Sequence, residues 1–155
     1  MDQKQLRNLV RKILGDSDLI KYDDERDVEL LMLTAATESH LGHYIHQVNG
    51  IALGIFQMEP NTEKDIWENY LRYNRDLSAY IKEYINEDWN FGEELEWNLA
   101  YQILMARVHY LRVKEAIPPK NDTVGLAKYY KKYYNTYLGK STTEKATEKY
   151  NKYVK

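Results

Sequence analysis

The sequence predicts a mainly α-helical single domain that spans residues 1–155 and carries one small β-hairpin. Three observations support this fold class. Apolar residues recur at helical spacing through most of the chain. One stretch, residues 44–60, breaks that rhythm and contains a tight-turn signal. No internal repeat, low-complexity run or linker divides the chain, and its length is enough to bury one hydrophobic core.

The first two predicted helices form the N-terminal quarter of the chain. An amphipathic segment from about residue 3 to residue 14 stops at Gly15, a residue type that often ends helices. The segment DERDVELLMLTAATESHLG, residues 24–42, has acids crowded into its first turns and a glycine after its end. Glu38 therefore lies near the C-terminal end of a mostly apolar helix, where burying a carboxylate is costly.

The predicted β-hairpin covers the stretch YIHQVNGIALGIFQMEP, residues 44–60. Asn49-Gly50 is a strong tight-turn signal, and β-branched and aromatic residues lie on both sides of it. We expect a small, irregular hairpin that lies beside the cleft in which Glu38 acts.

Five further helices are predicted after the hairpin. They cover about residues 61–71, 77–85, 91–116, 122–139 and 141–154. Pro60 favours the start of the first, and two consecutive prolines end the long central helix. Asp122 or Thr123 is expected to cap the fourth. Ser141 and Glu144 have capping-box spacing at the start of the last.

The composition indicates a globular protein, with 43% hydrophobic and 30% charged residues. The chain has no cysteine, so the fold needs no disulfide. Its 15 tyrosines suit a wet aromatic groove, because tyrosine buries a ring and keeps a polar tip. The N-terminus lacks the apolar region of a secretory signal, and no apolar stretch is long enough to span a membrane. We expect synthesis in the cytoplasm without a signal peptide.

The charge is unevenly distributed along the chain. Residues 120–155 contain nine lysines against three acids, a local charge of +6 in a chain whose net charge is −2. This asymmetry indicates either an anionic partner for the C-terminal part or a solvated, lysine-rich helical face. Both interpretations stay open on the sequence.

The stretch ESHLGHYIH, residues 38–46, concentrates the candidate chemistry. It holds Glu38 and three of the four histidines, His40, His43 and His46. The histidine spacing lacks the His-Glu-x-x-His pattern of a zinc helix, and Gly42 interrupts the helix between the first two histidines. We therefore expect no metal site and no cofactor, and we interpret the histidines as loop residues at the edge of the cleft.

Nucleophilic catalysis has little support in the sequence. There is no cysteine and no Gly-x-Ser-x-Gly elbow, and Ser39 points about 100° away from Glu38 on a helix. The remaining interpretation is a lone carboxylic acid. Desolvation would raise the pKa of Glu38, so that it could donate a proton near neutral pH, as cleavage of a glycosidic bond requires.

Two stretches carry a family resemblance. ATESHLG followed by LGIFQMEPNT is similar to the lysozyme-like soluble lytic transglycosylase superfamily, which includes goose-type lysozymes and phage muralytic enzymes. Glu38-Ser39 matches the family's Glu-Ser at a helix end, and the Gly-x-x-Gln element follows, with Gln57 19 residues after Glu38. A third element, Tyr-Asn, resembles Tyr134-Asn135, although neighbouring tyrosines offer other registers. The likeness covers about residues 28–136.

The resemblance implies a lysozyme-like fold and a role for each matched residue. Glu38 would be the general acid and then the base in cleavage between N-acetylmuramic acid and N-acetylglucosamine. Ser39 would orient Glu38 or contact the sugar. The remaining implied substrate-binding residues are Gln57, Met58, Tyr134 and Asn135. The family's Ala-Gly after Tyr-Asn is replaced here by Thr136-Tyr137, so the shape of that loop is expected to differ.

A second catalytic carboxylate is not required by this chemistry. A neighbouring acetamido group or the sugar's own hydroxyl can trap the oxocarbenium-like centre. Glu59, Glu63 and Asp65 are the candidates if a second acid acts, and each is alternatively a solvated acid at a helix start. Tyr130, Tyr133, Tyr134 and Tyr137 form a helical stripe that we expect to be mostly core, with Tyr134 the one most suited to function.

We therefore expect a peptidoglycan-degrading glycosidase, either a lytic transglycosylase or a lysozyme-type hydrolase of phage or prophage origin. The partner is the peptidoglycan glycan strand, and we expect a monomer that binds no nucleic acid and does not span a membrane. It would reach the cell wall through a membrane pore or as a virion component. The alternative is a non-catalytic virion-structural or cell-wall-binding protein that keeps the fold. A nucleic-acid binder that uses the basic C-terminal part is the third interpretation.

Overall fold

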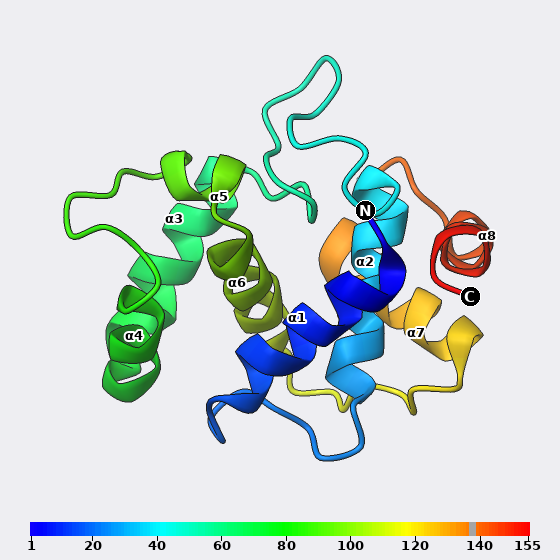
Figure 1. The fold of residues 1–155 in the computed structure, drawn as a ribbon, viewed down its shortest axis with the longest axis horizontal. Helices are drawn as coiled ribbons and strands as arrows, with labels where there is room; N and C mark the ends of the chain where they lie inside the picture. The colour runs from blue at the N-terminus through cyan, green and yellow to red at the C-terminus, as the bar shows by residue number, and fades with distance from the viewer. Residues whose placement is uncertain (137–138) are drawn as a thin grey trace.

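The structure is a computed structural model that describes residues 1–136 and 139–155, and it is built from helices (Figure 1). Eight α-helices are formed by the described residues: α1 (Gln3–Gly15), α2 (Arg26–Ser39), α3 (Pro60–Asn69), α4 (Arg75–Lys82), α5 (Glu93–Trp97), α6 (Leu99–Leu111), α7 (Thr123–Tyr130) and α8 (Thr143–Tyr153). A 3₁₀ turn, Leu71–Tyr73, follows α3, and a π-helical turn, Lys131–Asn135, extends α7. None of these helices is long and apolar enough to cross a membrane.

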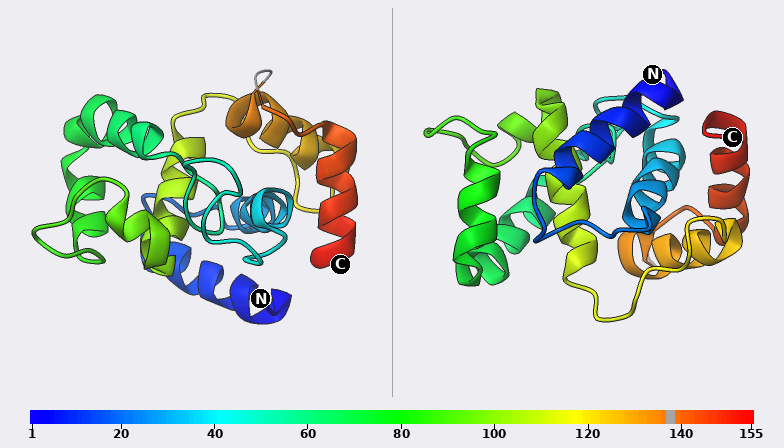
Figure 2. Two further views of the ribbon diagram at one scale, coloured as in Figure 1. Left: turned by 90° about the horizontal axis from the view of Figure 1, so that it is seen from above. Right: turned by 60° about the horizontal axis from the view of Figure 1, so that its bottom comes forward.

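Helix α2 is the central element of the larger group of helices. It packs against α1, α6, α7 and α8, and its residues from Val28 to Ala36 are buried except for Glu29. Helices α3, α4 and α5 lie together on the other side of α6 (Figures 1 and 2). Helix α6 is nearly all buried because it packs against both groups, through α1 and α2 on one side and α3 and α5 on the other.

The predicted β-hairpin does not form as two strands. In the described part of the chain, residues 44–60 contain only single antiparallel bridges, His46 with Leu53 and Leu53 with Met58. Asn49 lies in the left-handed region at the expected turn, but the Gln47 side chain accepts from the Ala52 N–H and closes the loop. Local side-chain bonds therefore replace a continuous strand ladder.

The predicted long central helix is two helices. Asn98 separates α5 from α6 with extended backbone, and its side chain accepts from the Tyr101 N–H at 3.1 Å. A side chain that caps a new helix competes with continuation of the old one. Helix α6 ends at Leu111, before the predicted 116. The residues between α6 and α7 form no regular secondary structure, and Ile117 among them is buried.

The other helical predictions differ from the structure mainly at their ends. Asp122, one of the two predicted N-cap residues, caps α7 by accepting a hydrogen bond from the Gly125 N–H. The capping box predicted at Ser141 and Glu144 is wrong by one residue, because Thr142 is the N-cap of α8 and accepts from the Lys145 N–H.

A buried polar network holds α3 to α6. The Glu63 carboxylate accepts from the Tyr101 hydroxyl at 2.5 Å and from the Gly92 N–H at 2.7 Å. The Trp67 indole N–H donates to the same Tyr101 hydroxyl at 2.8 Å. Glu63 and Tyr101 are completely buried, so the bonds replace the water that each group has lost. The prediction of Glu63 as a solvated acid is therefore wrong.

Replacing Tyr101 by Phe should destabilise the protein by about 2–3 kcal/mol, because it leaves a buried carboxylate oxygen and a buried indole N–H without partners. Urea unfolding followed by circular dichroism measures the change. Tyr73→Phe is the matched control, since Tyr73 is 77% exposed and its substitution should cost less than about 0.5 kcal/mol. Equal effects of the two substitutions would show that the network does not stabilise the fold.

Candidate functional site

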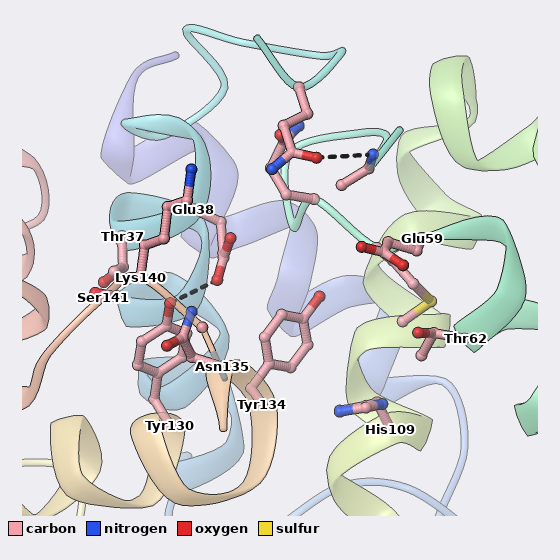
Figure 3. A pocket seen from close by; sticks show the side chains of 15 residues that line it. Thr37, Glu38, Glu59, Thr62, His109, Tyr130, Tyr134, Asn135, Lys140 and Ser141 are labelled. Atoms are coloured by element: carbon pink, nitrogen blue, oxygen red, sulfur yellow. Dashed lines mark hydrogen bonds between the residues drawn. The ribbon is translucent and has the colours of Figure 1, made fainter. Parts of the chain in front are cut away.

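An open pocket with a volume of about 500 Å³ lies between the two groups of helices (Figure 3). This size is within the range of ligand-binding clefts. Its lining comes from α2, the 47–59 segment, α3, α6, the end of α7, the π-helical turn and the residues before α8. Five of the six predicted catalytic and substrate-binding residues line the pocket, namely Glu38, Gln57, Met58, Tyr134 and Asn135.

The backbone turns sharply after the carboxyl-bearing end of α2. Glu38 is the penultimate residue of that helix, and the next residues outside it, His40 and Leu41, both have left-handed φ angles of 52° and 60°. Such conformations are unfavourable for residues other than glycine, and they concentrate at functional sites. The His40 and Leu41 N–H groups bond back to carbonyls of Ala36 and Ala35, which closes the helix end.

The Glu38 carboxyl is held in a largely dry position at the pocket wall. Burial raises its pKa from the ordinary value to about 7, and hydrogen bonds from Tyr130 and Asn135 partly oppose that rise by favouring the charged form. The Tyr130 hydroxyl donates to Glu38 Oε1 at 2.5 Å (Figure 3). Near neutral pH, Glu38 is therefore poised to hold or release a proton.

Ser39 supports the site without facing the pocket. Its side chain is completely buried, and its hydroxyl donates to the Ile55 carbonyl at 2.6 Å and accepts from the Gly42 N–H at 2.9 Å. These bonds fasten the end of α2 to the 54–58 turn. Of the two roles implied for Ser39, the geometry favours orientation of the helix end that carries Glu38 over contact with a ligand.

The segment Gly54–Met58 forms a tight turn on the pocket wall. Gly54 has φ of +76°, and a Cβ there would lie 2.5 Å from the Leu95 carbonyl oxygen, so only glycine fits. The Gln57 amide donates to the Gly54 carbonyl at 2.8 Å, and Gln57 itself is left-handed with φ of 49°. Buried Gln102, which the sequence did not single out, accepts from the Ile55 N–H at 2.9 Å.

Two tyrosines of the stripe formed by α7 and the π-helical turn make different hydrogen bonds. Tyr130 bonds Glu38, whereas the Tyr134 hydroxyl donates to the Phe56 carbonyl at 2.6 Å. Burial raises the pKa of both hydroxyls, so both stay protonated and donate. The two rings stack with centroids 6.0 Å apart. Tyr134 was expected to be the tyrosine most suited to function, but Tyr130, one turn earlier, makes the direct bond to Glu38. Tyr137 lies outside the described residues.

The fourth histidine, His109 of α6, lines the pocket and was not predicted. Its Nε2–H donates to the Tyr133 carbonyl at 3.2 Å, and its Nδ1 accepts from Arg112 at 3.0 Å. Arg112 in turn bonds Asp65. Burial lowers the pKa of His109 to about 4, and the nearby Arg112 adds to the shift. A neutral ring with this tautomer holds a carbonyl of the π-helical turn that carries Tyr134.

The three histidines of the 38–46 stretch lie outside the pocket lining. His40 stacks on Tyr153 of α8, with ring centroids 5.1 Å apart and planes 11° from parallel. His43 and His46 are exposed. Within residues 1–136 and 139–155, no group of three or more His, Asp or Glu side chains is arranged to hold a metal ion. Because His40 packs against α8, the prediction that this histidine lies at the edge of the cleft is wrong.

The three candidate second acids have different surroundings. Glu59 lines the pocket on the side opposite Glu38 (Figure 3). Glu63 is buried in the network with Tyr101, and Asp65 is paired with Arg112 at 3.0 Å. Only Glu59 of these three has access to a molecule in the pocket.

Comparison with protein-family models, with curated protein sequences and with solved structures gave no significant match. The interpretation of the site therefore depends on its own geometry and chemistry.

Replacing Tyr130 by Phe should raise the pKa of Glu38 by about one unit above its value near 7, because a hydrogen bond to the charged carboxylate is lost. Titration of ¹³C-labelled glutamate carboxyls by NMR measures it. Tyr134→Phe is the control, since the Tyr134 hydroxyl bonds a backbone carbonyl instead and its loss should move the pKa less. An unchanged or lower Glu38 pKa in Tyr130→Phe would contradict this assignment.

The buried His109 should make the protein less stable in acid. Its folded-state pKa, about 4, lies below the unfolded value near 6.5, so the unfolded chain binds the proton first. Stability from His109 is complete above pH about 6.5 and is lost, by roughly 3 kcal/mol in total, as pH falls to about 4.

His109→Gln can keep both hydrogen bonds but cannot take up a proton, so its stability should fall less than that of the wild type between pH 7 and pH 4. Urea unfolding across this range measures the difference. The control is His43→Gln at an exposed position, which should keep the wild-type pH dependence. Parallel stability curves for wild type and His109→Gln would rule out the buried neutral histidine.

Proposed function

We propose that this protein is a peptidoglycan-cleaving glycosidase with a lysozyme-like fold, in which Glu38 is the single general acid and base. The observation that carries the proposal is the Glu38 carboxyl itself. It lies in the wall of an open pocket, its pKa is about 7, and Tyr130 donates a hydrogen bond to it. Few buried acids in a protein are both half-protonated near neutral pH and accessible to a ligand.

The chemistry follows from the two protonation states of Glu38. The neutral acid donates its proton to the glycosidic oxygen, the bond from that oxygen to the sugar's anomeric carbon breaks, and the alcohol leaves. The carboxylate that remains keeps the Tyr130 hydrogen bond, which stabilises it. It then takes the proton of the attacking group. Water as attacker gives a hydrolytic product, and the muramyl C6 hydroxyl gives a 1,6-anhydro product.

The rest of the pocket fits a hydroxyl-rich sugar chain. Gln57, Asn135 and Thr62 supply hydrogen-bonding groups, while Met58 and Tyr134 supply apolar surface. Most of the side chains that line the pocket are polar, which suits a ligand that carries many hydroxyl groups. Substrate contact by these residues is part of the proposal, as is delivery to the cell wall through a pore or in a virion.

Glu38→Gln should reduce the clearing of purified peptidoglycan by 10²–10⁴-fold, because the amide cannot transfer the proton. Turbidity decrease and mass spectrometry of released fragments measure it, and the mass also separates an anhydro end from a hydrolysed one. Glu59→Gln is the matched control on the opposite wall and should keep most activity. Lysis by Glu38→Gln at the wild-type rate would exclude the mechanism.

Two other outcomes of the same experiment have definite meanings. If wild type and Glu38→Gln bind peptidoglycan equally and neither cleaves it, the protein is a non-catalytic cell-wall-binding or virion-structural protein. If Glu59→Gln is as inactive as Glu38→Gln while both remain folded by circular dichroism, two carboxylates act together and the single-acid proposal is wrong.

A further inference from the structure

One flank of α8 carries three lysines that form no ion pair among the described residues, although Glu144 and Glu148 lie on the same helix. Lys145, Lys149 and Lys152 follow one another at intervals of four and three residues, so they form a stripe along one side of the helix. In the described part of the chain, the lysines that form ion pairs are Lys21, Lys64 and Lys132. The ammonium groups of these three lysines are therefore available to a partner outside the chain.

Aromatic rings lie beside this lysine stripe. Lys149 and Lys152 place their Nζ atoms 6.0 Å and 5.2 Å from the centre of the Tyr153 ring. His40 stacks on the same ring, and Tyr44 contacts His40 in turn, with centroids 5.4 Å apart. The stack on Tyr153 places the His40 ring beside α8, outside the pocket lining.

The geometry of the lysine stripe fits a linear polyanion. The rise from Lys145 to Lys152 along the helix axis is about 10 Å, so the charges are repeated along a line and are not gathered around one point. Helix α8 lies at the edge of the molecule, where a long chain can pass (Figures 1 and 2). Lysine ammonium groups act as point charges that suit phosphate groups.

The aromatic rings distinguish between two kinds of phosphate polymer. Proteins that bind single-stranded nucleic acid offer free aromatic faces on which bases stack. Here the Tyr153 ring is already covered by His40 on one side and approached by two lysines. A polymer without bases needs no such face, because its phosphates meet only the lysines.

We propose that the lysine stripe of α8, with the Tyr153–His40 stack beside it, binds a base-free phosphodiester polymer of the polyol-phosphate class. His40 follows Glu38 by two residues in the chain, so a polymer bound here runs past the end of α2 that carries the candidate acid. The binding itself does not depend on the proposed catalytic activity, and it can be measured in its absence.

The probe is fluorescently labelled poly(glycerol phosphate), with binding followed by anisotropy at several salt concentrations. The logarithm of the binding constant should fall with the logarithm of salt with a slope of about −2, as three phosphate contacts predict for a flexible chain. Lys145→Gln, Lys149→Gln and Lys152→Gln together should weaken binding at least tenfold at low salt and remove most of the slope. The triple arginine variant should retain binding, because it keeps the charge.

The matched control changes three exposed lysines elsewhere, Lys4, Lys12 and Lys114, to Gln and so alters the net charge equally. It should leave binding nearly unchanged. Equal loss in both triple variants, or no binding by wild type at low salt, would overturn the proposal. Single-stranded DNA bound as tightly as poly(glycerol phosphate) would also overturn it and would favour a nucleic-acid partner. Circular dichroism confirms that each variant is folded.

Discussion

The arrangement of this protein depends on the hydrogen bond between Tyr130 and Glu38. A carboxyl group near the end of an apolar helix loses most of its water, and without a partner it would destabilise the fold. The Tyr130 hydroxyl, 92 residues later in the chain, is that partner at 2.5 Å. The bond can form only if α7 packs beside α2, so the same contact that closes the core also completes the candidate site.

The backbone on both sides of the pocket is shaped by residues in unusual conformations. His40 and Leu41 are left-handed just after Glu38, and Gln57 is left-handed on the facing turn. Each costs free energy on the order of 1 kcal/mol, which the packing around it must offset. Ser39 joins the two turns through its bond to the Ile55 carbonyl. These three strained positions therefore lie at the two turns that Ser39 joins, although Glu25, at the start of α2, is left-handed as well.

Local sequence signals predicted the elements that depend on local chemistry. Asp122 caps its helix as its residue type indicates, and the helix that carries Glu38 follows from its apolar spacing. The errors occur where a side chain competes with regular structure. Asn98 caps a new helix inside a segment that the apolar pattern predicts as one continuous helix. Gln47 closes a loop where the sequence predicts a hairpin. The spacing of apolar residues does not show where a side-chain hydrogen bond replaces a backbone one, because a single capping bond leaves that spacing unchanged.

The sequence by itself predicted a helical domain, and it singled out Glu38 as the candidate acid because an acid in an apolar helix is exceptional wherever the helix packs. It also indicated Gln57 and a tyrosine partner on a late helix. Only the tertiary structure decided that Tyr130 bonds Glu38, that His109 borders the pocket, and that the His40 ring packs on α8. These choices depend on how helices distant in the chain are rotated against each other, and that rotation is set by packing of the whole core.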